Sequence, residues 1–188
     1  MDTKNDIITI YHYSIADLDI ITQAVEKHKI DDSFIELIKE ENLYPIIRSE
    51  NGQYFFVITL SVCEENSIRN YEIDCVITPH CVVLYSNCNI SIINKLIKDI
   101  TTTDIADTLQ KLVQGFCTHM LDTIKNLETI VYDFQRHGIG NESINEENIE
   151  SIMKTKMDIG ILKSTIVPFI DIVEHITEEI INKLSAEE

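Results

Sequence analysis

The sequence predicts a fold of the α+β or α/β class, with a mixed β-sheet layered with helices (an α/β/α sandwich) and followed by a long antiparallel helical hairpin. Two observations lead to this prediction. The first hundred residues alternate between strand and helix patterns, and the remaining residues carry apolar side chains at heptad spacing. We therefore predict an α/β sandwich domain over residues 1–103 and a long helical hairpin, the start of a stalk-like region, over residues 104–188.

Length and composition limit the possible functions. The chain has 188 residues, of which 44% are hydrophobic and 25% charged, and these are globular proportions. Its net charge of −17 argues against nucleic acids and anionic membrane surfaces as partners, because each phosphate contact needs a lysine or arginine. Five glycines and three prolines leave few turns, so the elements should be long.

The five cysteines indicate a reduced environment. Their number is odd, residues 1–6 contain no apolar signal region, and no run of about 18 apolar residues could span a bilayer. We expect a soluble chain with free thiols.

The first elements follow in order along the chain. Residues 7–11 are rich in β-branched side chains and predict a strand. Ser14 is a candidate N-cap for a helix that reaches about His28. Asp31 or Asp32 is expected to cap a second, short helix.

Two hairpins and another helix complete the predicted sandwich. Asn51-Gly52 tolerates positive φ at both turn positions and joins residues 44–49 to residues 54–63. A second hairpin joins residues 72–78 to residues 81–86, and residues 92–100 have a helical pattern. The sheet should therefore have at least five strands.

A heptad pattern follows Asp104. Gaps alternating between four and three separate the apolar positions Val113, Cys117, Met120, Ile124, Leu127, Val131 and Phe134. A helix from Asp104 to Arg136 would be about 50 Å long. It should end at residues 138–141, and Asn141 or Asn145 should cap the return helix.

The return helix repeats the pattern. Positions seven apart form its predicted seam, and others fill in between: Ile152, Ile159, Ile166, Val173 and Ile180, with Ile149, Leu162, Ile170, Ile176 and Leu184. We expect this seam to pack against the first long helix and both helices to cover part of the sheet.

The possible catalytic and metal-binding residues favour no enzyme. Cys75, His80, Cys81 and Cys88 lie close in sequence but lack the spacing of a zinc site, so core thiols are the better interpretation. Cys117 and His119 are two residues apart on one helix and point to different faces. No glycine-rich phosphate loop is present.

Acidic clusters occur at Glu36/Glu40/Glu41, Glu146/Glu147/Glu150 and Glu178/Glu179. Solvated helix faces explain them. Weak binding of a hard cation such as Mg²⁺ to carboxylate oxygens is the alternative.

The order of elements resembles the N-terminal cytoplasmic domain of the CorA family of magnesium and divalent-cation transporters. Four stretches are similar to the family pattern: KIDDSFIELIKEENLYP at 29–45, YFFVITL at 54–60, IDCVITPHCVVL at 73–84, and LKSTIVPFIDIV at 162–173. The last contains the family's Thr-Ile-x-Pro inside a helix, here ending at Pro168.

The resemblance implies a regulatory domain at the cytoplasmic face of the cell membrane that couples occupancy by Mg²⁺ or Co²⁺ to gating. It implies divalent cations and self-association (a pentamer in the full-length family) as partners, with no tightly bound cofactor. Contact with the membrane would come only through transmembrane helices that this sequence lacks.

The family senses metal through acids on neighbouring domains. Glu36 matches one acidic position and is the predicted metal contact, but the next acid falls on Leu37 and a third on Gln114. These departures leave a second hypothesis open: a protein-interaction module in which the helical hairpin binds a partner and no ion is involved.

Overall fold

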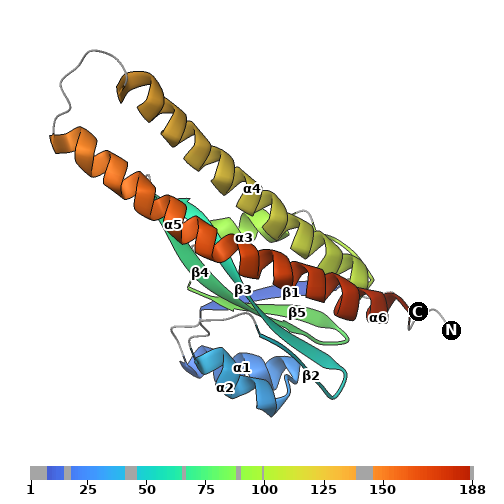
Figure 1. Cartoon of the computed structure of the whole chain (residues 1–188). Helices are drawn as coiled ribbons and strands as arrows, with labels where there is room; N and C mark the ends of the chain where they lie inside the picture. Colours follow the sequence, from blue (N-terminus) through green and yellow to red (C-terminus); the bar gives the residue numbers. More distant parts are fainter. Residues whose placement is uncertain are drawn as a thin grey trace.

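A five-stranded sheet separates two layers of helices in the computed structural model of the chain (Figure 1). The structure describes the backbone of residues 8–14, 18–40, 46–64, 67–87, 90–98, 100–138 and 146–186. The strands are β1 (Thr9–Ser14), β2 (Ile47–Glu50), β3 (Gln53–Glu64), β4 (Ser67–Ile77) and β5 (Cys81–Ser86), in the order β1-β5-β4-β3-β2. Because β1 is parallel to β5 and the other neighbours are antiparallel, the predicted mixed sheet is confirmed.

The helices lie on both faces of this sheet, as predicted. One face carries α1 (Leu18–His28) and α2 (Ile35–Lys39), and Figure 1 shows the remaining helices on the other. These are α3 (Ile90–Ile97), α4 (Ile105–Gly138), α5 (Glu146–His175), a π-helical segment (Ile176–Ile181) and α6 (Asn182–Ala186).

Local sequence explains several element ends. Asn51 and Gly52 have φ values of 50° and 74°, so the turn between β2 and β3 forms where the sequence predicted it. Asp31 accepts a hydrogen bond from the Ser33 amide at 2.9 Å and caps the turn before α2. Ser14, the candidate N-cap, is the last residue of β1 and pairs with Ser86, and residues 15–17 between it and α1 lie outside the described residues, so its role as a cap stays a prediction.

The sheet has an apolar core on each face. Alternate residues of β3 point to opposite sides, so that Phe56 and Ile58 face the long helices while Phe55 and Val57 face α1 and α2. All four side chains are almost fully buried. Burial on both faces explains why β3 is a continuous apolar run rather than an alternating one.

The helix α4 begins where the sequence indicated. The carboxylate of Asp104 accepts hydrogen bonds from the Ala106 amide at 3.0 Å and the Asp107 amide at 2.8 Å. Val113, Met120 and Leu127 of the predicted seam are buried, whereas the side chain of Phe134 lies outside the described residues. Leu109, Leu112 and Phe116, which are fully buried in the core between the sheet and the long helices, were not part of the predicted seam.

The predicted seam of α5 is partly wrong. Ile152, Ile159 and Ile170 are 53%, 40% and 47% exposed. The buried stripe also keeps three- and four-residue gaps and includes the predicted Leu162 and Ile176, but its other positions were not predicted: Thr155, Asp158, Thr165, Phe169 and Ile172. Three of these seven side chains are polar. A pattern of hydrophobic residues alone therefore predicts the neighbouring series through Ile152 and Ile159 instead.

Hydrogen bonds to the sheet and within α5 explain the buried polar positions of α5. The carboxylate of Asp158 accepts from the Ile68 amide at 3.0 Å, and the Thr165 hydroxyl accepts from Asn70 Nδ2 at 2.8 Å. On α4, the Thr123 hydroxyl donates to the Ser61 carbonyl at 3.0 Å. Both long helices are therefore joined to the sheet by hydrogen bonds as well as packed on it. The predicted boundary between two domains at residue 103 stays a prediction.

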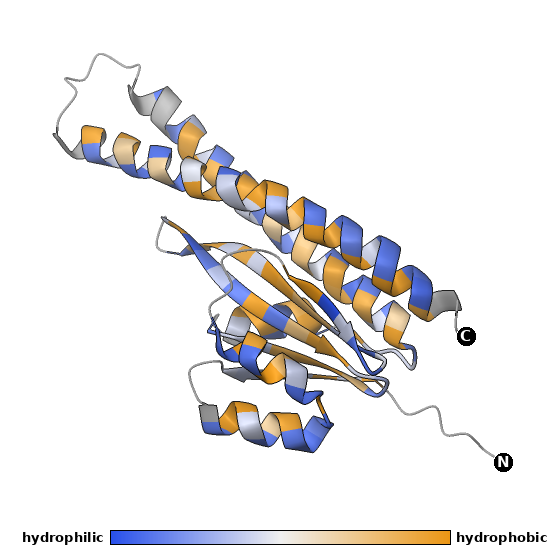
Figure 2. Ribbon diagram, turned by 60° about the horizontal axis from the view of Figure 1, so that its bottom comes forward, coloured by the Kyte–Doolittle hydropathy of each residue, from blue (hydrophilic) through white to orange (hydrophobic). Residues whose placement is uncertain are grey.

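The two long helices run side by side in opposite directions and extend beyond one edge of the sheet (Figure 1). Figure 2 shows hydrophobic residues, in orange, along the first turns of α5 in this extension. Pro168 lies inside α5 without ending it, as the resemblance suggested. Among the described helices, none has a stretch long and apolar enough for a membrane crossing.

Candidate functional site

Glu36, the predicted metal contact, lies on the outer side of α2. Its side chain is 78% exposed, and Lys39 Nζ is 3.7 Å from its Oε1 atom. An exposed ion pair of this length holds the carboxylate weakly. Phe34 and Ile38 anchor the helix in the core, so Glu36 is presented to solvent from a fixed element.

The two neighbouring sensing positions are not assembled around Glu36. Leu37 is half-buried and packs against the core on the α1–α2 face. Gln114 is exposed on α4, which covers the opposite face of the sheet. A single chain therefore brings Glu36 and Gln114 to different layers, and a site that used both would need two copies of the chain.

Other acids provide no alternative within one chain. Glu40, Glu178 and Glu179 are exposed, and Glu41 and the side chains of Glu146 and Glu147 lie outside the described residues. Across the described part of the chain, no three His, Cys, Asp or Glu side chains converge as metal ligands.

Cys75 and Cys81 are core thiols, as the sequence analysis expected. Cys75 faces the long helices and Cys81 faces α1 and α2, so the sheet separates them, and both are buried. Burial raises the pKa of both thiols. His80 is exposed, and Cys88 lies outside the described residues.

A contact between a cysteine and a histidine escaped the sequence analysis. His28 Nδ1 lies 3.7 Å from Cys81 Sγ, and its Nε2 lies 2.8 Å from the Tyr13 hydroxyl. Burial raises the pKa of Cys81 and lowers that of His28, and both shifts disfavour a thiolate paired with a charged imidazole. His28 is the last residue of α1 and Cys81 the first of β5, so packing of α1 on the sheet brings them together, and no sequence spacing indicates that.

Asp74 is a second feature that the sequence did not reveal. It lies on β4 with no exposed surface, and neither carboxylate oxygen has a hydrogen-bond partner in its ionised form. Burial, together with the charge of Glu72 and a hydrogen bond to it, raises the Asp74 pKa to about 9. Asp74 is therefore protonated at neutral pH, and Glu72 can accept its proton in a hydrogen bond.

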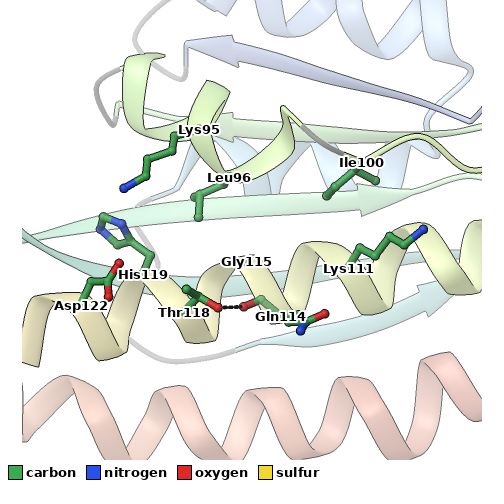
Figure 3. Close-up of a pocket in the computed structure, with 9 residues that line it drawn as sticks. All are labelled: Lys95, Leu96, Ile100, Lys111, Gln114, Gly115, Thr118, His119 and Asp122. Atoms are coloured by element: carbon green, nitrogen blue, oxygen red, sulfur yellow. Dashed lines mark hydrogen bonds between the residues drawn. The ribbon is translucent and has the colours of Figure 1, made fainter.

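Two adjoining cavities border α4. One, of about 390 Å³, lies between α3 and α4, and the other, of about 550 Å³, extends toward the ends of β3 and α3. Both are lined by Lys95, His119 and Asp122. Figure 3 shows these three side chains at one end of the smaller cavity, with Leu96 and Ile100 along the α3 side and Lys111 at the far end.

The arrangement of the sheet and helices is shared with known proteins. The CorA magnesium transporter from Methanocaldococcus jannaschii matches 89% of the chain at 12% identity, with a TM-score of 0.64. The soluble domain of that CorA matches the same share at 13% identity with a TM-score of 0.62. The fold is that of the soluble domain of CorA.

A third structure agrees with this assignment. The ZntB cytoplasmic domain from Vibrio parahaemolyticus matches 93% of the chain at 13% identity with a TM-score of 0.54, and the chain covers 79% of it. The chain spans 55% of the complete CorA and 69% of its soluble domain. No family model matches the sequence, and no curated protein does.

Proposed function

We propose that this chain is the cytoplasmic regulatory domain of a CorA-like divalent-cation transporter. The observation that supports this most directly is the match of 89% of the chain to the soluble domain of CorA. In this proposal the domain lies at the cytoplasmic face of the membrane and acts without catalysis, by changing its association with neighbouring copies.

The mechanism follows from the position of Glu36. Its exposed carboxylate stands on the outer helical layer, where a neighbouring copy could present another acid to the same Mg²⁺. Bare carboxylates repel each other, and a shared cation offsets the repulsion. A cation that binds the associated arrangement better shifts the population toward it, and loss of the cation reverses the shift. The net charge of −17 adds to the repulsion in the absence of metal.

Sedimentation velocity with EDTA, and then with about 10 mM MgCl₂, tests the proposal. We expect the particle mass to rise with Mg²⁺ and the rise to be lost in Glu36→Gln. Glu128→Gln is the matched control, because Glu128 is an exposed acid on α4, on the opposite face of the sheet. An unchanged mass in both buffers, or equal behaviour of the two variants, would contradict metal-coupled association through Glu36.

A second candidate function, a protein-interaction module, is favoured by exposed apolar side chains at the start of α5. Ile149, Ile152, Met153 and Met157 are between 48% and 69% exposed. If association depends on this surface, the double variant Met153→Ser/Met157→Ser will lower the particle mass in EDTA, whereas Glu36→Gln will not. The two variants therefore separate the two functions.

A further inference from the structure

The groove between α3 and α4 combines a free cation with an unsatisfied ring nitrogen. Lys95 extends from α3 toward the ring of His119 on α4 (Figure 3), and both line the two adjoining cavities. Within the part of the chain that the structure describes, Lys95 makes no ion pair. The other lysines at the groove do: Lys111 lies 2.8 Å from Asp107, and Lys125 lies 3.9 Å from Asp122.

One ring nitrogen of His119 lacks a hydrogen-bond partner among the described residues. This atom, Nε2, is buried. Burial and the charge of Lys95 lower the His119 pKa, and Asp122 partly opposes this shift. The ring is therefore neutral at pH 7, and in the tautomer with its proton on Nε2 it can donate a hydrogen bond to a ligand.

The acids that line the two cavities are paired with other side chains. Glu64 accepts a hydrogen bond from the Tyr71 hydroxyl at 2.7 Å and lies 3.8 Å from Arg69, and Asp122 pairs with Lys125. A metal cation entering here would face the unpaired ammonium of Lys95. An anion would meet two hydrogen-bond donors at the same end of the cavity, the charged ammonium of Lys95 and the neutral ring N–H of His119.

The other end of the groove suits an apolar body. Leu96 lines it from α3, Ile100 from the segment just after α3, and Gly115 from α4. A volume of about 390 Å³ lies within the range of small-molecule sites.

We propose that this groove binds a small organic anion, whose acidic group is held by Lys95 and His119 and whose apolar body lies against Leu96 and Ile100. The shared ligand chemistry is a phosphate or carboxylate group attached to an apolar ring or chain. This site is on the opposite face of the sheet from Glu36 and does not depend on the proposed cation coupling.

Titration of the full chain with phenyl phosphate, followed by NMR signals of the His119 ring and the Gly115 amide, tests the proposal. Inorganic phosphate and phenol test the head group and the apolar body separately, and benzoate tests the carboxylate alternative. We expect saturable binding of phenyl phosphate or benzoate, tighter than that of inorganic phosphate, and no binding of phenol.

Variants locate the binding in the groove. Lys95→Met should weaken it roughly tenfold or more, because a hydrogen bond to a charged group is lost. His119→Phe should weaken it while keeping a ring in place. The control Lys98→Met removes the same charge from an exposed residue just after α3 that does not line the groove. The proposal is overturned if Lys95→Met binds as tightly as the unmodified chain, if no saturation occurs up to about 10 mM ligand, or if phenol binds as tightly as phenyl phosphate.

Discussion

The carbonyl oxygen of Leu96 lies directly over Gly115. A Cβ atom at position 115 would stand 3.3 Å from Leu96 O and 3.7 Å from Leu96 Cδ2. The close approach of α3 to α4 therefore depends on the missing side chain, and it sets the width of the groove between these helices.

Replacement of glycine by alanine should have different effects at two sites in the long helices. A Cβ atom at Gly160 in α5 would have no other side chain or element within 4 Å, so Gly160→Ala should raise the free energy of unfolding by about 0.5–1 kcal/mol through lower chain entropy in the unfolded state. Gly115→Ala should raise the free energy of unfolding by less, or lower it, because α3 must move to make room for the new Cβ atom. Urea unfolding followed by circular dichroism measures the free energy of unfolding of both variants. Equal increases would show that α3 moves at no cost in free energy.

Asp158 should stabilise the chain through one buried hydrogen bond. Asp158→Ala leaves the Ile68 amide without its acceptor, and we expect a loss of about 1–3 kcal/mol in the free energy of unfolding. Asp158→Asn retains an acceptor oxygen and should lose less. Asp171→Ala, at an exposed position of the same helix, is the control and should change stability by less than about 0.5 kcal/mol. A similar loss in the Asp158 and Asp171 alanine variants would argue against this role.

Asp74 should make stability depend on pH. Its pKa of about 9 in the folded chain is far above the ordinary value of 3.8, so between these values the folded state keeps a proton that the unfolded state releases. The contribution of Asp74 to the free energy of unfolding therefore falls as the pH rises through this range.

Asp74→Asn removes this titration, and the stability of the variant relative to the unmodified chain should increase by about 1 kcal/mol or more from pH 5 to pH 8. Denaturation curves at several pH values measure the difference. Parallel pH profiles for the two proteins would show that Asp74 is ionised in the fold.

The corrected position of the buried stripe on α5 can be tested with two aliphatic residues. Leu162 is 5% exposed and Ile159 is 40% exposed. Leu162→Ala should cost about 2–5 kcal/mol because it opens a cavity in the core, whereas Ile159→Ala should cost clearly less. If Ile159→Ala proved the more destabilising in chemical unfolding, the predicted seven-residue series through Ile159 would be the buried one after all.

Much of the fold could be predicted because local chemistry determined it. Asn51-Gly52 has the positive φ values that its turn requires, and Asp104 caps the helix that the heptad pattern indicated. The continuous apolar run of β3 and the hairpin before β5 followed from side-chain type and spacing. The resemblance to the CorA family, seen in four short stretches, agrees with the fold of the CorA structures.

The candidate sites could be predicted only in part. Glu36 lies exposed on the helix where the sequence placed it, and its role as a metal contact stays a prediction. Lys95 and His119 are 24 positions apart and carry no motif; packing of α3 on α4 brings them together. Cys81 and His28 likewise meet through the packing of α1 on the sheet.

The sequence by itself determined where strands, turns and helices form, because each depends on residues within a few positions of one another. Tertiary structure decided which stripe of α5 is buried, because the sheet supplies hydrogen-bond partners for Asp158 and Thr165 that no hydrophobic pattern records. It also decided the state of Asp74, since the pKa of a carboxyl group depends on the burial that only the assembled layers impose.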